Sequence, residues 1–157
     1  MRYIAKLFIP FSLLLTSCVN HYVIPSGSST TKMLFSTTQQ IHADIFTFEE
    51  PAEDCKNERY IGSIHNYAIS NEPSVATTIS TDKVFVAHMR QTGTYSNGVT
   101  LGSTYCAITF RFTPVASAEY IADVGVCKIK VFRIDANAVN GKVEEPTFAR
   151  SSKQCNW

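Results

Sequence analysis

The sequence lacks the features of three common classes of protein. Its apolar-rich stretch from Leu7 to Leu15 is too short for a transmembrane helix, which needs about 20 apolar residues. Its 14 Lys plus Arg are matched by 13 Asp plus Glu, so no net field attracts nucleic acid. Helical periodicity is weak throughout, and the best segment, residues 136–145, is interrupted by Gly141. We expect neither a helical membrane protein, nor a nucleic-acid-binding protein, nor a helical bundle.

Motifs that carry catalysis or bind metals are also missing. No two cysteines have the two-to-four-residue spacing of a zinc site or the spacing of a dithiol redox pair. The segment LGST at residues 101–104 lacks the second glycine of a G-x-S-x-G nucleophile elbow. The acidic cluster at residues 49–54 surrounds Pro51, without the ligand spacing of a calcium loop, and favours a solvated turn. We therefore expect no cofactor, no metal and no enzymatic activity.

The chain begins with the pattern of an export signal. Arg2 and Lys6 precede the apolar stretch, and the small residues Thr16 and Ser17 follow it directly before Cys18. A short apolar segment behind cations and ahead of small residues is typical of a signal peptide. We assign residues 1–17 to this segment.

The sequence at residues 15–18, Leu-Thr-Ser-Cys, resembles the lipobox of bacterial lipoproteins. The resemblance implies that the thiol of Cys18 takes a diacylglycerol, that cleavage occurs before it, and that the new amine is acylated. Two acyl chains already give stable anchoring, so three would hold the protein permanently at the membrane. By analogy with the family, Val19 after the cysteine implies an outer-membrane destination. An ordinary secretory cleavage site is the alternative.

Cleavage would leave 140 residues, the size of one domain. Losing Arg2 and Lys6 leaves 12 Lys plus Arg against 13 Asp plus Glu, a formal charge of −1, so the acyl chains must supply the membrane attachment. Residues 18–36 are rich in Ser and Thr and are predicted to be a flexible tether of about 20 Å. Packing of this segment as an irregular edge is the alternative. Residues 37–157 are expected to form the domain.

Four further cysteines predict two disulfides in an exported chain. They are Cys55, Cys106, Cys127 and Cys155. The favoured pairing joins Cys55 to Cys106 and Cys127 to Cys155, which would tie the C-terminus to the last strong strand. The rival pairing joins Cys106 to Cys127, because a hairpin turning near Pro114 would bring these two close together.

The remaining pattern is that of short β-strands. Runs rich in Val, Ile, Phe, Tyr and Thr alternate with turn formers such as Asn97-Gly98 and Asn140-Gly141. We predict seven or eight antiparallel strands in two layers, an immunoglobulin-like or transthyretin-like β-sandwich, with a small closed barrel as the alternative. The alternation slips at Ile45-Phe46 and again near Phe132, which predicts a β-bulge at each place.

The four histidines, His21, His42, His65 and His88, are spaced 21, 23 and 23 residues apart. Imidazole is the commonest metal ligand, so the regular spacing raises a metal hypothesis. In a sandwich this spacing has meaning only where the strands align. We expect exposed or singly hydrogen-bonded histidines instead.

A recognition surface is predicted between two strong strands, over residues 90–106. The segment starts at Arg90, is rich in Gly, Ser, Thr and Asn, and carries Tyr95 and Tyr105. Tyrosines among small polar residues give rigid contact area with adaptable hydrogen bonds. The alternative is a hairpin loop that binds nothing.

The preferred hypothesis is a non-enzymatic outer-membrane lipoprotein whose domain faces the periplasm. It would act as an adaptor or binding module for an envelope protein, and its architecture resembles that of small lipoprotein subunits of envelope secretion machines. The alternative is a periplasmic inhibitor or immunity lipoprotein acting on a lysozyme or toxin. The strand-borne Ser-Gly-Ser-Gly-type motif of lysozyme inhibitors is not matched, since Ser26-Gly27-Ser28-Ser29 lies in the expected tether.

Overall fold

The computed structural model describes residues 19–48, 57–67, 71–96 and 101–151. The signal peptide, Cys18, Cys55 and Cys155 lie outside these ranges, and the predictions made for them remain predictions. Within the described ranges no helix has the length and apolar character needed to cross a membrane.

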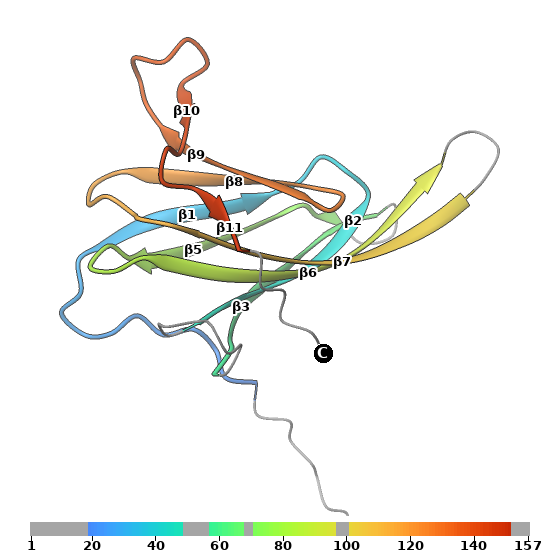
Figure 1. The fold of residues 1–157 in the computed structure, drawn as a ribbon, viewed down its shortest axis with the longest axis horizontal. Helices are drawn as coiled ribbons and strands as arrows, with labels where there is room; N and C mark the ends of the chain where they lie inside the picture. Colours follow the sequence, from blue (N-terminus) through green and yellow to red (C-terminus); the bar gives the residue numbers. More distant parts are fainter. Residues whose placement is uncertain (1–18, 49–56, 68–70, 97–100, 152–157) are drawn as a thin grey trace, which may run out of the picture.

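The described residues form two stacked β-sheets (Figure 1). The five-stranded sheet has the order β10-β9-β8-β1-β5, and the six-stranded sheet has the order β11-β7-β6-β2-β3-β4. This arrangement confirms the β-sandwich and excludes the closed barrel. The strands are β1 (Thr30–Ser36), β2 (Ile41–Thr47), β3 (Arg59–Asn66), β4 (Asn71–Glu72), β5 (Ser74–Ser80), β6 (Phe85–Ser96), β7 (Leu101–Phe112), β8 (Glu119–Gly125), β9 (Lys128–Ile134), β10 (Lys142–Glu144) and β11 (Ala149–Arg150).

The core lies between the sheets and is built by alternation along the strands. In β2, every second residue from Ile41 to Thr47 is buried, while the residues between them are half-buried on the outer face. Gly62 in β3 permits a close approach to β5, because a Cβ at this position would lie 2.7 Å from Val75 Cγ2. Fully buried side chains from both sheets include Phe35, Ile41, Ile45, Ile64, Ile79, Met89, Phe110, Phe112 and Val131.

One predicted bulge is confirmed and the other is wrong. The β2–β3 register shifts between Ile45 and Phe46, where the alternation slips in the sequence. The register of β9 with β8 runs without a shift from Lys128 to Arg133. Phe132 instead lies on the outer face, where the Lys142 ammonium sits 4.4 Å from its ring centroid.

The flexible tether predicted through residue 36 is wrong for residues 30–36. These residues form β1, which lies inside the five-stranded sheet between β5 and β8, and Met33 and Phe35 are buried in the core. The polar residues of this strand lie mostly at its N-terminal end, which hides its alternation in the sequence. β1 pairs with β8 in parallel, so the prediction of purely antiparallel strands also needs correction.

A disulfide joins Cys106 to Cys127. The favoured pairing of Cys55 with Cys106 and Cys127 with Cys155 is therefore wrong, and the rival pairing is the one observed. The hairpin turn that makes it possible connects β8 to β9, whereas Pro114 lies where the chain crosses from one sheet to the other. The disulfide thus links the two sheets, from β7 to the β8–β9 turn. If Cys18 carries lipid as predicted, Cys55 and Cys155 are the two cysteines left for a second disulfide, and both lie outside the described residues.

Two glutamine side chains hold the same turn. The Gln91 carbonyl oxygen accepts a hydrogen bond from the Cys127 N–H at 2.8 Å, and the Gln39 carbonyl oxygen accepts one from the Val126 N–H at 2.7 Å. Gln91 is almost completely buried. A buried amide that satisfies a turn N–H in this way stabilises the turn, because either group left unpaired would be costly.

The disulfide should contribute substantially to stability. It closes a loop with a sequence separation of 21, so replacing both cysteines with alanine should lower the free energy of unfolding by about 3 kcal/mol. Urea denaturation of the wild-type and Cys106→Ala/Cys127→Ala proteins measures this loss. Peptide mapping without reduction should recover residues 106 and 127 in one linked pair, and a link from Cys106 to Cys55 would contradict the structure.

Candidate functional site

The outer face of the six-stranded sheet carries a row of polar and aromatic residues across five strands. Strand register aligns Tyr105 with Thr92, Thr92 with His42, His42 with His65, and His65 with Glu72. Neighbours across strands lie about 5 Å apart, so their side chains can interact along the row. The row combines an exposed phenol, a hydroxyl, two imidazoles and a carboxylate.

A chain of hydrogen bonds runs through the middle of this face. Ser63 Oγ lies 2.9 Å from His65 Nε2, and His65 Nδ1 lies 2.7 Å from His42 Nδ1. The other end of the chain is Asp44, whose Oδ2 lies 3.2 Å from His42 Nε2.

One proton arrangement satisfies all three contacts. The Ser63 hydroxyl donates to His65 Nε2, His65 Nδ1–H donates to His42 Nδ1, and His42 Nε2–H donates to the Asp44 carboxylate. In this arrangement each of the three contacts has one donor and one acceptor. These three hydrogen bonds therefore fix four side chains of β2 and β3 on the outer face.

The histidine spacing has structural meaning for one pair only. His42 and His65 are direct cross-strand neighbours, whereas His88 on β6 pairs with Phe46 and His21 bridges to Tyr60. Among the described residues, no group of three or more His, Cys, Asp or Glu side chains could hold a metal ion. The expectation of exposed or singly bonded histidines is wrong for His42 and His65, because the strand register places their rings together.

Arg90 lies on the same face but is held by neighbouring groups. Its Nη2 lies 2.6 Å from Glu58 Oε2, and its guanidinium lies 4.4 Å from the centroid of the Phe46 ring. Burial raises the pKa of Glu58 above its ordinary value, which outweighs the opposing effect of the Arg90 charge. Arg90 therefore joins β6 to Glu58, the residue before β3.

The two tyrosines predicted for recognition, Tyr95 and Tyr105, lie on β6 and β7. Tyr105 on β7 is 65% exposed, and it stands beside Thr92 in the cross-strand row. Tyr95 pairs with Gly102 in the β6–β7 ladder, and its side chain lies outside the described part of the chain. The strand register places Tyr105 and Arg90 on the same face of the sheet. Sequence reasoning did not predict the hydrogen-bonded group of Ser63, His65, His42 and Asp44. Its members become neighbours through the pairing of β2 with β3, which the local sequence pattern does not show.

His88 is fully buried although it lies on the outer side of β6. Its Nδ1 lies 2.9 Å from Thr109 Oγ1, and the Phe48 ring packs near it at a centroid distance of 6.1 Å. Burial lowers the pKa of His88 to about 4, and the nearby Arg90 charge adds to this effect. His88 is thus a neutral, structural histidine at ordinary pH.

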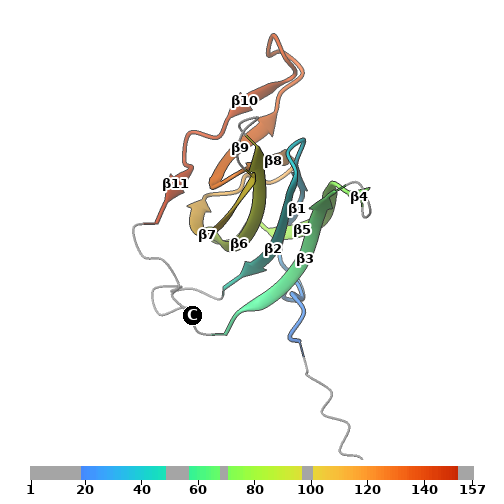
Figure 2. The same cartoon turned by 90° about the vertical axis from the view of Figure 1, so that its right-hand side faces the viewer.

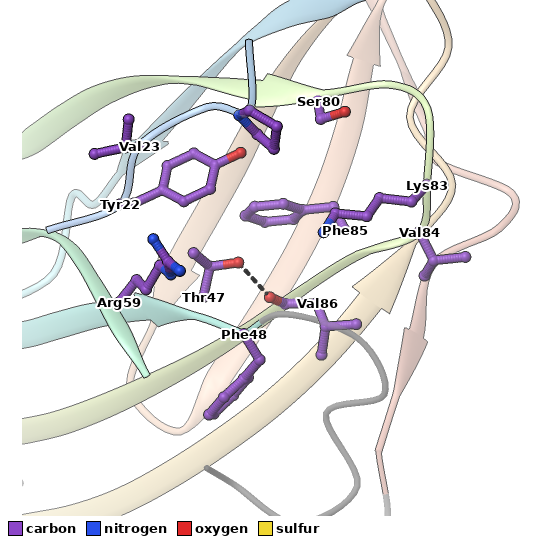
Figure 3. Close-up of a pocket in the computed structure, with 11 residues that line it drawn as sticks. Tyr22, Val23, Thr47, Phe48, Arg59, Ser80, Lys83, Val84, Phe85 and Val86 are labelled. Carbon is purple, nitrogen blue, oxygen red and sulfur yellow. Dashed lines mark hydrogen bonds between the residues drawn. The ribbon is translucent and has the colours of Figure 1, made fainter. Parts of the chain in front are cut away.

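A small cavity lies at one end of the sandwich, beside the N-terminal segment (Figure 3). Its volume is about 20 Å³, room for about one water molecule. The Tyr22 ring lies along it, and burial raises the pKa of this phenol, with a smaller opposing effect of the Ser80 backbone and the Arg59 charge. The Thr47 hydroxyl donates to the Val86 carbonyl at 2.8 Å across the cavity wall. The remaining lining residues are Val23, Pro25, Phe48, Arg59, Lys83, Val84 and Phe85.

A larger, open hollow of about 400 Å³ lies over the five-stranded sheet. Apolar residues line most of it, and Lys32 and Glu119 form an exposed ion pair at 3.3 Å beside them. Such an exposed pair contributes little to stability. Both cavities are separate from the hydrogen-bonded chain of Ser63, His65, His42 and Asp44, since they share none of its residues.

Comparison with models of known protein families and with curated proteins finds no match to this chain.

The burial of His88 predicts a specific loss of stability in acid. Its folded pKa of about 4 lies below the ordinary value near 6.5, so the unfolded state binds a proton more readily. The stability held above about pH 6.5 should fall as the pH drops toward 4, by about 3 kcal/mol for this group.

The measurement is urea denaturation between pH 7 and pH 4 for the wild type and for His88→Asn. The asparagine keeps a polar group near Thr109 but does not titrate. It should be less stable at pH 7 and show a shallower decline in acid. An identical pH slope in both proteins would show that His88 does not carry this dependence.

Proposed function

We propose that this chain is a bacterial lipoprotein, anchored in the outer membrane through acylated Cys18, whose β-sandwich acts as a binding module in the periplasm. Its partner is another protein of the envelope, and the domain serves as a non-enzymatic adaptor. The export pattern at residues 1–17 and the Leu-Thr-Ser-Cys sequence that ends at Cys18 support the anchor.

The main support for the binding proposal is the exposed Tyr105 at the end of the cross-strand row. Its side chain is 65% exposed on the outer face of β7, beside Thr92. Tyrosine supplies broad contact area, while its two side-chain torsions limit the entropy lost on binding. The exposed ring is therefore suited to anchoring a protein partner.

The neighbouring side chains make this surface rigid before a partner arrives. His42 and His65 are fixed by their hydrogen bonds, and Tyr67 donates a hydrogen bond to the Thr92 carbonyl at 3.2 Å. A surface that is already ordered loses less conformational freedom on binding.

Replacing Tyr105 should weaken partner binding without unfolding the domain. We expect Tyr105→Ala to reduce the recovery of envelope proteins at least about fivefold, in line with the loss of an aromatic anchor at an interface. Crosslinking in intact cells, followed by purification of the acylated protein and mass spectrometry, measures this recovery.

Val139→Ala is the matched control, because Val139 is fully exposed on a different part of the surface, between β9 and β10. It should retain the same partners as the wild type. Equal recovery by Tyr105→Ala, or no partner at all with the wild type under conditions that retain established envelope complexes, would count against the proposal.

The anchor has its own test. Metabolic labelling with palmitate should mark the wild-type protein and be lost in Cys18→Ala, because the thioether and the acylated amine both form at this residue. Label that survives the substitution would contradict the assignment of Cys18. Immunoblotting of whole cells controls for expression of the variant.

An inhibitor or immunity lipoprotein is the second candidate, and the shape of the β6–β7 hairpin favours it. The two 12-residue strands extend beyond the rest of their sheet (Figure 1). An extended hairpin can enter the cleft of a target enzyme. Assay of the protein against a panel of lysozymes distinguishes this candidate, since an adaptor would leave their activity unchanged.

A further inference from the structure

The first described residues are attached firmly to the domain. The Asn20 carbonyl accepts a hydrogen bond from the Tyr60 N–H at 2.8 Å, and the Tyr22 N–H donates to the Tyr60 carbonyl at 2.9 Å. The His21 ring also packs edge-on against the Tyr60 ring, with centroids 5.7 Å apart. The N-terminal segment therefore pairs with the start of β3, which is the irregular edge that the sequence left as an alternative.

This attachment leaves very little free chain between the domain and Cys18. Only two residue steps separate Cys18 from Asn20, and an extended chain covers at most about 3.5 Å per step. The Cα atom of Cys18 must therefore lie within about 7 Å of the backbone at Asn20. Its sulfur, which would bear the lipid, can lie farther away only by the length of the side chain. A tether of about 20 Å is incompatible with this geometry.

The surface beside the attachment has the chemistry of a membrane contact. Val19 is 53% exposed and Val23 is 67% exposed, so two apolar side chains flank His21 on the outside of the segment. Lys83 is exposed at the rim of the neighbouring cavity, and Arg59 lines the same cavity (Figure 3). Exposed apolar side chains near a lysine suit the boundary between phospholipid head groups and acyl chains.

We propose that this end of the sandwich, carrying Val19, Val23 and Lys83, lies directly against the surface of an anionic phospholipid bilayer. The inference rests on the proposed acylation of Cys18, and it adds that the domain has a fixed orientation. Valines 19 and 23 enter the head-group region, and the ammonium of Lys83 faces lipid phosphates. Both views of the fold place this segment, drawn in blue, and the β9–β10 hairpin at opposite ends of the molecule (Figures 1 and 2).

Tryptophan fluorescence in vesicles tests the orientation. The full-length acylated protein is reconstituted into vesicles of phosphatidylethanolamine and phosphatidylglycerol, with or without brominated acyl chains near the head groups. Val23→Trp reports on the proposed contact, and Val139→Trp, on the exposed loop between β9 and β10, is the matched control. Both are made in a Trp157→Phe background, so that each protein has one tryptophan.

We expect brominated lipid to quench Val23→Trp at least about threefold more strongly than Val139→Trp, because quenching requires close contact with the bilayer. Val19→Trp is a second reporter should Val23→Trp lose its β-sheet circular dichroism, and it should be quenched in the same way. Equal quenching at the two ends, or quenching of Val139→Trp alone, would overturn the proposed orientation.

Acylation is measured separately by mass spectrometry of the purified protein. An acylated protein whose residues 19 and 23 escape quenching would overturn the orientation and leave the lipoprotein proposal intact. A protein with an unmodified Cys18 would overturn both, because the short connection would then end in no lipid.

Discussion

The covalent link between the two sheets at Cys106 and Cys127 constrains how the sheets lie on each other at one end of the core. Cys106 lies on β7 of one sheet and Cys127 in the β8–β9 turn of the other. Gln91 sits buried beside the disulfide, with its oxygen 2.8 Å from the Cys127 N and 3.8 Å from Cys106 Sγ. A covalent bond and a satisfied polar group thus fix the spacing of the sheets at this end, while apolar side chains fix it elsewhere.

Packing in the core determines which side chains become neighbours on the outer face of the six-stranded sheet. Because β2, β3, β6 and β7 are registered by their buried residues, their outward residues meet in fixed rows. His42 reaches His65 only because Ala43 and Ile64 are paired neighbours within the core side of the same ladder. The polar contacts of the surface are therefore consequences of apolar packing on the other side of the sheet.

The two-layer β architecture was predictable from the sequence because period-two alternation and turn formers are local signals. The bulge at Ile45 and Phe46 was predictable for the same reason. β1 was missed because its N-terminal residues are Thr, Thr and Lys, and only Met33 and Phe35 mark its buried side. Two features depend on which strands become neighbours. They are the pairing of the cysteines and the hydrogen-bonded chain of Ser63, His65, His42 and Asp44. That choice is made by long-range packing, which no single segment encodes.

The short connection before Asn20 also limits the reach of the molecule. On the proposed anchoring, the Tyr60 and Phe46 rings, which contact each other at a centroid distance of 5.5 Å, begin the outer face close to the lipid. The row of His42 and Tyr105 lies four residues further along β2, about 13 Å away. A partner that docks there must itself come within a few nanometres of the bilayer. The protein would thus select membrane-proximal neighbours, and it could not extend across the periplasm to search for distant ones.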